Sequence, residues 1–506
     1  MEERANITTG SRGKLGIMHT IAEYANRLPH PFIMFLILFV ATLILSAIMS
    51  VWVEPVHHPV TNELVQVRSL LSWDGLRFMV TKAVSNFTGF RPLGLVLMMV
   101  LALGLIQKTG LADATIKSML SNVSPRLITP AVVMTSIIGN LVSDAAVFLI
   151  PPLAAIMYKT VGRNPIAGIV VAFIAIFAGF SANFFIAGTD LLLSGISTEV
   201  VQSVSPGYEV SVVANWFFMC ASVPLITLII TVMNDKYTEP MLNRYHPVEQ
   251  NVTDNISGNL TARERKALRR TGMAAFVFIA LLLILIMPEN SGLRNSEGGL
   301  LPSPFMSGLV PIIMIFFCLC GIVYGVTVGK IKTSADVPRL MEEAMREMCG
   351  FVVIVFMVAQ FIAIFNWSNL AIVGAVNDAD WLLHISLPPA LVLLGFILLA
   401  AVVNLFIYSG SAQWALMAPI FLPMLMLLGL EPEAIQAAYR IADSSTNVIS
   451  PINPYLPLIL AVIQNYNKSF SLGHLLTTAM PYSIAILSGW TLMYFIWFKL
   501  GIPFGL

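Results

Sequence analysis

Seven long apolar segments limit the possible folds of this chain more than any other feature of its sequence. A helix needs roughly 20 predominantly apolar residues to cross about 30 Å of hydrocarbon. Only 11% of the 506 residues are charged, whereas a soluble domain has about 25%, so polar side chains are too few to cover a water-exposed surface. We therefore expect an all-α integral membrane protein. The segments are residues 31–53, 92–108, 211–233, 271–288, 304–327, 349–370 and 478–499.

Four further apolar segments carry polar residues at their centres. Segments 165–195 and 434–465 are long enough to cross a bilayer, whereas 126–160 and 387–430 are apolar on both sides of a polar centre. Unpaired backbone groups are too costly against lipid, so a break at membrane depth survives only inside protein or beside a water-filled cavity. We interpret the first two segments as broken helices and the last two as re-entrant hairpins. The prediction is about nine transmembrane helices plus two hairpins.

The two halves of the chain repeat one another. Asp74-Gly-Leu-Arg77-Phe-Met79 recurs as Asp336-Val-Pro-Arg339-Leu-Met341, Ser143 to Pro151 recurs as Ser411 to Pro419, and Ser181-Ala-Asn183 recurs as Ser445-Thr-Asn447. Three matches in the same order indicate a duplication, and the extra segment 271–288 between the halves inserts them with opposite topology. Inverted repeats with broken helices are typical of secondary transporters.

These patterns divide the chain into five parts. They are a cytoplasmic N-terminal segment (1–28), a first inverted repeat (29–234), a basic cytoplasmic loop with a linking helix and an outer loop (235–303), a second inverted repeat (304–499) and a C-terminal tail (500–506). The N-terminal segment and the 235–270 loop are rich in Lys and Arg, so the N-terminus is expected in the cytoplasm. A net charge of +1 argues against a nucleic-acid partner, because no basic surface attracts phosphates.

The polar residues at the breaks are the candidate site residues. A helix that begins at a break presents unpaired N–H groups and its positive dipole end to an anion, while carbonyls of the opposite half-helix bind a cation. In the first broken helix, Asp190 supplies an oxygen ligand or a protonatable group, or it caps the following segment. In the first hairpin tip, Asp144 is open to the same two interpretations. Asn183 and Asn447 lie at the repeated breaks, where Na⁺ could bind.

The second broken helix carries two opposite charges three residues apart. Arg440 and Asp443 lie on one helix face, so one interpretation is a structural ion pair. The other is that Arg440 attracts an anionic solute while Asp443, with Ser445 nearby, exchanges a proton or holds a cation. We favour the second interpretation because Pro451 and Pro454 remove backbone donors where the chain must unwind.

The second hairpin tip contributes Ser409 and Ser411, whose hydroxyls can bind polar solute atoms, and Trp414. The indole offers a flat face to an aromatic ring or a cation, although a membrane Trp is also commonly an interfacial anchor. The sequence does not distinguish Na⁺ from H⁺ as the coupling ion, because both use oxygen-rich groups. It does not give the direction of transport either.

Absent motifs exclude other classes of function. The chain has no Gly-x-x-x-x-Gly-Lys-Ser/Thr phosphate loop, no His-Glu-x-x-His and no Gly-x-Ser-x-Gly. We therefore expect neither an ATP-driven pump nor an enzyme, and no cofactor. A passive channel is the other alternative, but channels usually form one pore from rings of small subunits rather than from paired broken helices.

Several long motifs resemble the AbgT family, the p-aminobenzoyl-glutamate transporters of bacteria. The motifs are Pro29-His-Pro31-Phe, Ser143-Asp-Ala-Ala146 with Pro151-Pro152, Gly179-Phe-Ser-Ala-Asn183, Thr189-Asp-Leu-Leu-Leu-Ser-Gly-Ile-Ser-Thr-Glu199, Phe365-Asn-Trp-Ser-Asn369, Ser409-Gly-Ser-Ala412 with Trp414, and Arg440-Ile-Ala-Asp-Ser-Ser445. The resemblance implies nine transmembrane helices and two hairpins in each protomer of a homodimer, located in the bacterial inner membrane.

The same resemblance implies two activities and a set of site residues. One activity is uptake of p-aminobenzoyl-glutamate, a folate breakdown product, and the other is proton-driven efflux of sulfonamide antimetabolites, which gives antibiotic resistance. Both solutes contain an aminobenzene ring that would suit Trp414, and the dicarboxylate of the first would suit Arg440. The residues implied are Asp190, Ser411, Trp414, Arg440, Asp443 and Pro451, with Asn183 and Asn447 at the breaks.

Overall fold

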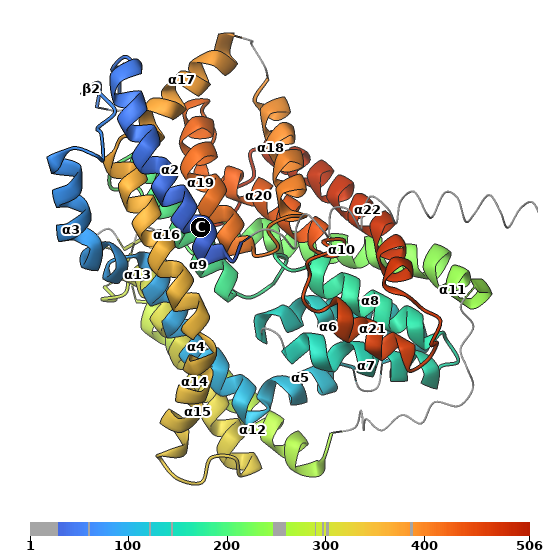
Figure 1. Cartoon of the computed structure of the whole chain (residues 1–506). Coiled ribbons are helices and arrows are strands. Elements are labelled where there is room, and N and C mark those ends of the chain that lie inside the picture. The colour runs from blue at the N-terminus through green and yellow to red at the C-terminus, as the bar shows by residue number, and fades with distance from the viewer. Residues whose placement is uncertain are drawn as a thin grey trace, which may run out of the picture.

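The computed structural model describes residues 29–58, 61–120, 123–142, 145–245, 260–288, 290–295, 298–299, 303–384 and 388–506. Within these residues the regular secondary structure is helical with one exception (Figure 1). The exception is a short antiparallel pair, in which β1 (Val56–His57) lies against β2 (Leu64–Val65). The predicted segment 1–28 and the predicted site residue Asp144 lie outside the described residues.

The helices follow the order that the repeat predicts. The first set is α2 (Pro31–Trp52), α3 (Trp73–Thr88), α4 (Arg91–Thr109), α5 (Leu111–Leu120), η1 (Pro125–Leu127), α6 (Ile128–Gly139), η2 (Asn140–Val142), α7 (Ala145–Thr160), α8 (Pro165–Ala178), α9 (Gly188–Val201) and α10 (Trp216–Met233). The connecting elements are η3 (Asn234–Thr238), α11 (Glu239–Tyr245), α12 (Ala262–Ile286) and α13 (Pro304–Ser307). The second set is α14 (Leu309–Val328), α15 (Asp336–Glu347), α16 (Cys349–Trp367), α17 (Leu370–His384), α18 (Pro389–Asn404), α19 (Gly410–Leu427), α20 (Pro432–Asn447), α21 (Leu456–Gln464) and α22 (Leu472–Lys499).

Eight helical stretches of the described chain are long and apolar enough to cross a membrane. Seven of them coincide with the seven apolar segments expected from the sequence, and the eighth, α19, lies inside the hairpin segment 387–430. The all-α membrane fold is therefore confirmed. Helix α12 has only 6% of its most apolar window buried, so its leucine, isoleucine and phenylalanine side chains face outward, where lipid is the expected solvent.

Both predicted breaks and both hairpins are present. Helix α8 ends at Ala178 and α9 begins at Gly188, while α20 ends at Asn447 and α21 begins at Leu456. The first hairpin helix, α6, has 12 residues and is about 18 Å long, which is too short to cross a bilayer. In the first hairpin, α6 is followed by the short 3-10 helix η2, and in the second hairpin, α18 and α19 are joined by the non-helical residues 405–409.

Helices of each repeat pack against helices of the other repeat. Helix α2 lies along α16, and its counterpart α14 lies along α4 (Figure 1). Likewise the helix α3 packs on α16 and its counterpart α15 packs on α4, while α9 packs on α19 and α21 packs on α7. Such an exchange of partners is what a two-fold relation between inverted halves produces.

The broken helices occupy the centre of the molecule. Every residue of α8 is buried, and so is every residue of α20 except Glu433. Helix α8 is apolar throughout its length, whereas α20 carries a polar and charged half that ends at Asn447. Burying a polar helix is costly unless its side chains are hydrogen-bonded or paired. Of these two central helices, it is α20 of the second repeat that places polar and charged side chains in the core.

Helices α4 and α15 approach so closely that one glycine contact can be tested. A Cβ atom at Gly104 would lie 2.2 Å from the Cβ of Ala344, whereas a Cβ at Gly94 on the same helix would meet nothing within 4 Å. We expect Gly104→Ala to lower the free energy of unfolding by about 1–3 kcal/mol, because the two helices must move apart. Thermal unfolding in detergent measures this change.

Two further variants control the glycine experiment. Gly94→Ala should leave stability unchanged or raise it slightly, because alanine favours the helix. Adding Ala344→Gly to Gly104→Ala removes the clashing methyl group and should restore stability. Equal unfolding temperatures for Gly104→Ala and Gly94→Ala would show that the contact between α4 and α15 is not as close as described.

Candidate functional site

A cavity of about 460 Å³ lies where the two hairpin tips and the two helix breaks meet. A volume of this size suits a small organic solute, since ligand pockets typically occupy about 300–1,000 Å³. Its lining includes residues from both hairpin tips, from both broken helices and from α4, α15 and α16. The polar lining residues are Gln107, Asn140, Thr189, Glu347, Tyr408, Ser409, Ser411, Asn447 and Tyr455.

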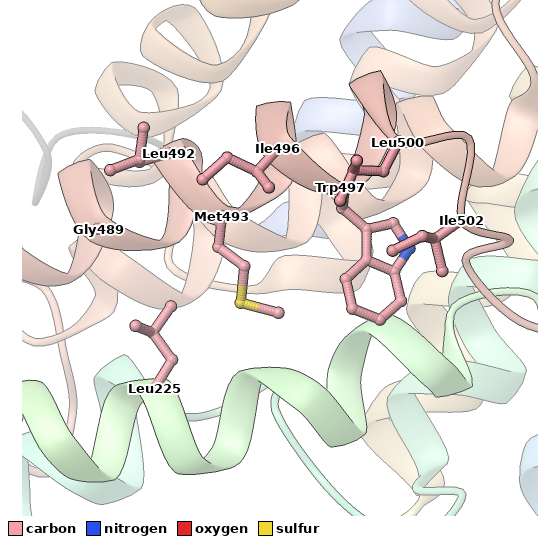
Figure 2. Close-up of a pocket in the computed structure, with 8 residues that line it drawn as sticks. All are labelled: Leu225, Gly489, Leu492, Met493, Ile496, Trp497, Leu500 and Ile502. Carbon is pink, nitrogen blue, oxygen red and sulfur yellow. The ribbon is translucent and has the colours of Figure 1, made fainter.

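A second cavity lies between α10 and α22 and differs in chemistry. Figure 2 shows its lining side chains, which come from Leu225 on α10 and from the end of α22 with the residues that follow it. All eight lining residues are apolar, except that Trp497 has an indole N–H, and this donates to the carbonyl of Pro503 at 3.3 Å. No lining residue is shared with the first cavity. This groove therefore offers no group that would recognise a polar solute.

The buried arginine of α20 pairs with the opposite repeat. Arg440 Nη1 lies 2.6 Å from Asp190 Oδ1, and Arg440 Nη2 donates to the carbonyl of Ser181 at 3.1 Å. The structural pair between Arg440 and Asp443, which the three-residue spacing allowed, is not the one formed. The reason is that the first break brings a carboxylate and a free carbonyl to the same guanidinium, which has donors for both.

Asp190 has two functions at the start of α9. Its Oδ2 accepts a hydrogen bond from the N–H of Ala187 at 2.7 Å, while Oδ1 forms the ion pair with Arg440. The capping interpretation of this residue is therefore present together with the charge pairing. Asp190 thus joins the first break to the second repeat.

Asp443 is buried beside the second hairpin tip. A Cβ atom at Gly410, the first residue of α19, would lie 3.0 Å from each carboxylate oxygen, so the carboxylate packs closely against the backbone of this glycine. The positive end of the α19 dipole is at this point and favours a negative charge. Oδ1 of Asp443 makes no hydrogen bond in the structure. Arg440, Asp190 and Asp443 together carry one negative charge in excess when both carboxyls are ionised.

Asn404 ties the second hairpin to the broken helix. Its Nδ2 lies 2.7 Å from the carbonyl of Asp443, 2.9 Å from Thr446 Oγ1 and 3.0 Å from Asn447 Oδ1. A single amide at the end of α18 thus holds the last turn of α20. This contact was not anticipated, because one asparagine in an apolar hairpin helix gives no sign of which neighbour it meets.

Trp414 is fully buried and does not line the cavity. Its indole N–H donates to Ser197 Oγ at 3.0 Å, and its ring packs on Tyr439 with the centroids 4.6 Å apart. The hydroxyl of Tyr439 in turn donates to the carbonyl of Gly410 at 2.5 Å. In this conformation Trp414 positions the second hairpin tip against α9 and α20, and a solute in the cavity does not reach it.

Of the other predicted residues, some line the cavity and some do not. Ser409, Ser411 and Asn447 line it, while Asn183, Ser445, Pro451, Arg440 and Asp443 lie outside its lining. Asn183 is buried in the first break, where its Oδ1 accepts from the N–H of Phe185 at 3.2 Å and its Nδ2 makes no hydrogen bond. Ser445 Oγ donates back to the carbonyl of Ile441 at 2.6 Å. Among the described residues no group of three or more His, Cys, Asp or Glu side chains could hold a metal ion.

Sequence reasoning missed the aromatic part of the cavity. Phe177, Phe180, Phe351, Tyr408 and Tyr455 all line it. Four of the five lie within or directly beside a break or hairpin tip, so proximity to a break is the signal that could have found them. The fifth, Phe351, lines the cavity from α16.

The geometry of paired broken helices around one cavity agrees with the comparisons with known proteins. The model of the AbgT putative transporter family matches residues 16–506. This chain belongs to the AbgT transporter family. It is therefore a membrane transporter and not an enzyme.

Relatives of this AbgT protein match over nearly the whole chain. The p-aminobenzoyl-glutamate transport protein of Escherichia coli (strain K12) is 38% identical over 486 residues, which is 96% of this chain and 95% of that protein. The crystal structure of the Alcanivorax borkumensis YdaH transporter, at 38% identity, has a TM-score of 0.89 and covers 94% of this chain and 100% of that chain. Neisseria gonorrhoeae MtrF, described among antimetabolite efflux pumps, has a TM-score of 0.90 at 38% identity and covers 95% of this chain and 97% of that chain.

The pair between Asp190 and Arg440 gives a stability prediction. We expect Arg440→Gln and Asp190→Asn each to lower the free energy of unfolding by about 3–5 kcal/mol, because each leaves a buried charge without its partner. The double variant carries neither charge and should be closer to wild type. Thermal unfolding of the four proteins in detergent gives the coupling energy.

An exposed charge provides the control. Arg339 is 60% exposed in its pair with Asp336, so Arg339→Gln should change stability little. If the double variant were as unstable as the sum of the two single variants, the two side chains would not be interacting in the folded protein.

Proposed function

We propose that this protein transports p-aminobenzoyl-glutamate, or a related aminobenzoyl solute, by ion-coupled alternating access. The observation that carries the proposal is the cavity shared by four breaks, one pair from each repeat, where two halves can move against each other around a central solute. The name of the Escherichia coli relative supports the choice of solute. Ser409, Ser411 and Asn447 line the cavity and would hydrogen-bond polar atoms of the solute.

The coupling ion would act at the charge cluster behind the cavity. Asp443 is buried and one of its oxygens has no hydrogen bond, so binding a proton or Na⁺ there would neutralise the excess charge of the cluster. Asp190, Ser445 and Asp144 are further candidate groups, as are Asn183 and Asn447 for Na⁺. In this proposal Arg440 does not bind the solute directly in the present conformation, because Asp190 holds it. Pro451 would keep the second break unwound.

The proposal includes a location and an assembly. The protein would be a homodimer in the bacterial inner membrane, with its N-terminus in the cytoplasm and the bilayer around its apolar helices. The basic loop 235–270 supports this orientation through the positive-inside rule. Dimerisation rests on the family resemblance.

A second candidate function is proton-driven efflux of sulfonamide antimetabolites. The likeness to MtrF favours it, and sulfonamides share the aminobenzene ring of the first solute. Expression in a susceptible host distinguishes the two functions. Efflux would raise sulfonamide resistance, whereas uptake would let a p-aminobenzoate auxotroph grow on p-aminobenzoyl-glutamate.

Reconstituted transport tests the proposed solute and ion. An Na⁺ gradient and a pH gradient are imposed separately. We expect proteoliposomes to accumulate labelled p-aminobenzoyl-glutamate under the gradient of the coupling ion. Asp443→Asn should reduce gradient-driven uptake at least tenfold, because its side chain can no longer gain or lose a charge. Arg440→Ala should reduce uptake as well, through loss of the contacts with Asp190 and Ser181.

The controls are empty liposomes and Glu343→Gln, which removes a carboxylate that is exposed on α15. Uptake by Asp443→Asn at the wild-type rate under the same gradient would rule out the assigned coupling residue. A wild-type protein that fails to accumulate the conjugate under both gradients would rule out the solute in the uptake direction.

A further inference from the structure

Three aromatic rings form a row inside the cavity. The centroid of Phe177 lies 6.5 Å from that of Tyr408 and 5.6 Å from that of Tyr455, so Phe177 is the middle ring. The three rings come from three different breaks: the end of α8, the second hairpin tip and the start of α21. Phe177 is only 4% exposed, whereas the two tyrosines are half-buried. The two tyrosines are therefore the more accessible of the three rings.

This row has no counterpart in the inverted repeat. In the register that aligns Asn183 with Asn447, Phe177 corresponds to Ile441 and Tyr455 corresponds to Leu191. In the register that aligns Ser143 with Ser411, Tyr408 corresponds to Asn140. If aromatic rings were needed to build a break or a hairpin tip, both repeats would need them. The matching positions in the other repeat are not aromatic, so a ring at these three positions is not required to build a break or a hairpin tip and is available to the solute.

We propose that Tyr408 and Tyr455, supported by Phe177, form the subsite that binds the aromatic ring of the solute. Aromatic pairs prefer centroid separations of about 4.5–7 Å in offset or edge-to-face arrangements, and the spacings in this row fall in that range. Ser409, Ser411 and Asn447 line the same cavity and supply polar atoms for the rest of the solute. This inference rests on the proposed function, and it replaces Trp414 as the ring-binding residue in this conformation.

A binding experiment on the full-length protein in detergent tests the subsite. The probes are p-aminobenzoyl-glutamate and cyclohexanecarbonyl-glutamate, which has a saturated ring in place of the aromatic one. We expect Tyr408→Leu and Tyr455→Leu each to weaken binding of the aromatic conjugate by about three- to tenfold, the range expected for one aromatic contact. Both variants should bind the saturated analogue about as wild type does, so the preference for the aromatic ring should decrease.

The conservative variants separate the ring from the hydroxyl. Tyr408→Phe and Tyr455→Phe keep the ring and should bind the aromatic conjugate within about twofold of wild type. Phe278→Leu removes a ring that pairs with Phe316 on the outer helices, 5.6 Å between centroids, and it should leave both affinities unchanged. Thermal unfolding of each variant confirms that it is folded before its affinity is compared.

The outcomes distinguish this inference from the proposed function. If wild type binds the aromatic conjugate and both leucine variants bind it equally well, the ring subsite is wrong and the proposed solute stands. If a leucine variant loses both conjugates equally, its ring has a structural role and the subsite is again wrong. If wild type binds no p-aminobenzoyl-glutamate at all, the proposed solute fails, and the subsite fails with it.

Discussion

The cost of an unpaired peptide group in hydrocarbon is the constraint on which this fold depends. Two transmembrane helices break at mid-length, and their free groups must find partners within the protein. At the first break, the N–H of Ser181 donates to Ser444 Oγ at 3.0 Å, and the carbonyl of Ser181 accepts from Arg440 at 3.1 Å. Both partners belong to α20 of the other repeat. The second repeat therefore supplies the partners of the first break, which explains why the polar half of α20 is buried in the centre.

The same constraint organises the polar residues behind the cavity into a chain. Trp414 donates to Ser197 Oγ, Ser197 donates to Gln436 Oε1 at 2.7 Å, and Gln436 donates to Asn215 Oδ1 at 3.0 Å. This chain crosses from the second hairpin to α9, then to α20 and to the start of α10. Buried polar networks of this kind specify one arrangement of helices, because a half-satisfied network is costly. The network therefore fixes how the second hairpin, α9, α20 and the start of α10 pack together.

The sequence allowed prediction of the spans, breaks, hairpins and repeat, because each follows from a local pattern of apolar and polar residues. Partner choice in three dimensions was less predictable. The three-residue spacing places Arg440 and Asp443 on one helix face, yet Arg440 forms its ion pair with Asp190. Spacing along one helix does not show which charged side chain the opposite repeat places beside it. Trp414 lies near a hairpin tip, but its indole N–H donates to Ser197 on α9. Tyr408, which lies closer to the same tip, lines the cavity instead.

The position of Asp443 links binding of the coupling ion to binding of the solute in the proposed transport cycle. The positive end of α19 was expected to hold an anion, and the carboxylate of Asp443 already lies beside its first residue, Gly410. A carboxylate of the solute near Ser409 and Ser411 would meet the field of this buried negative charge. Like charges in a low-dielectric site repel strongly, so an anionic solute is favoured there when a proton or a cation has neutralised Asp443. Ion and solute would then bind together for an electrostatic reason, without a direct contact between them.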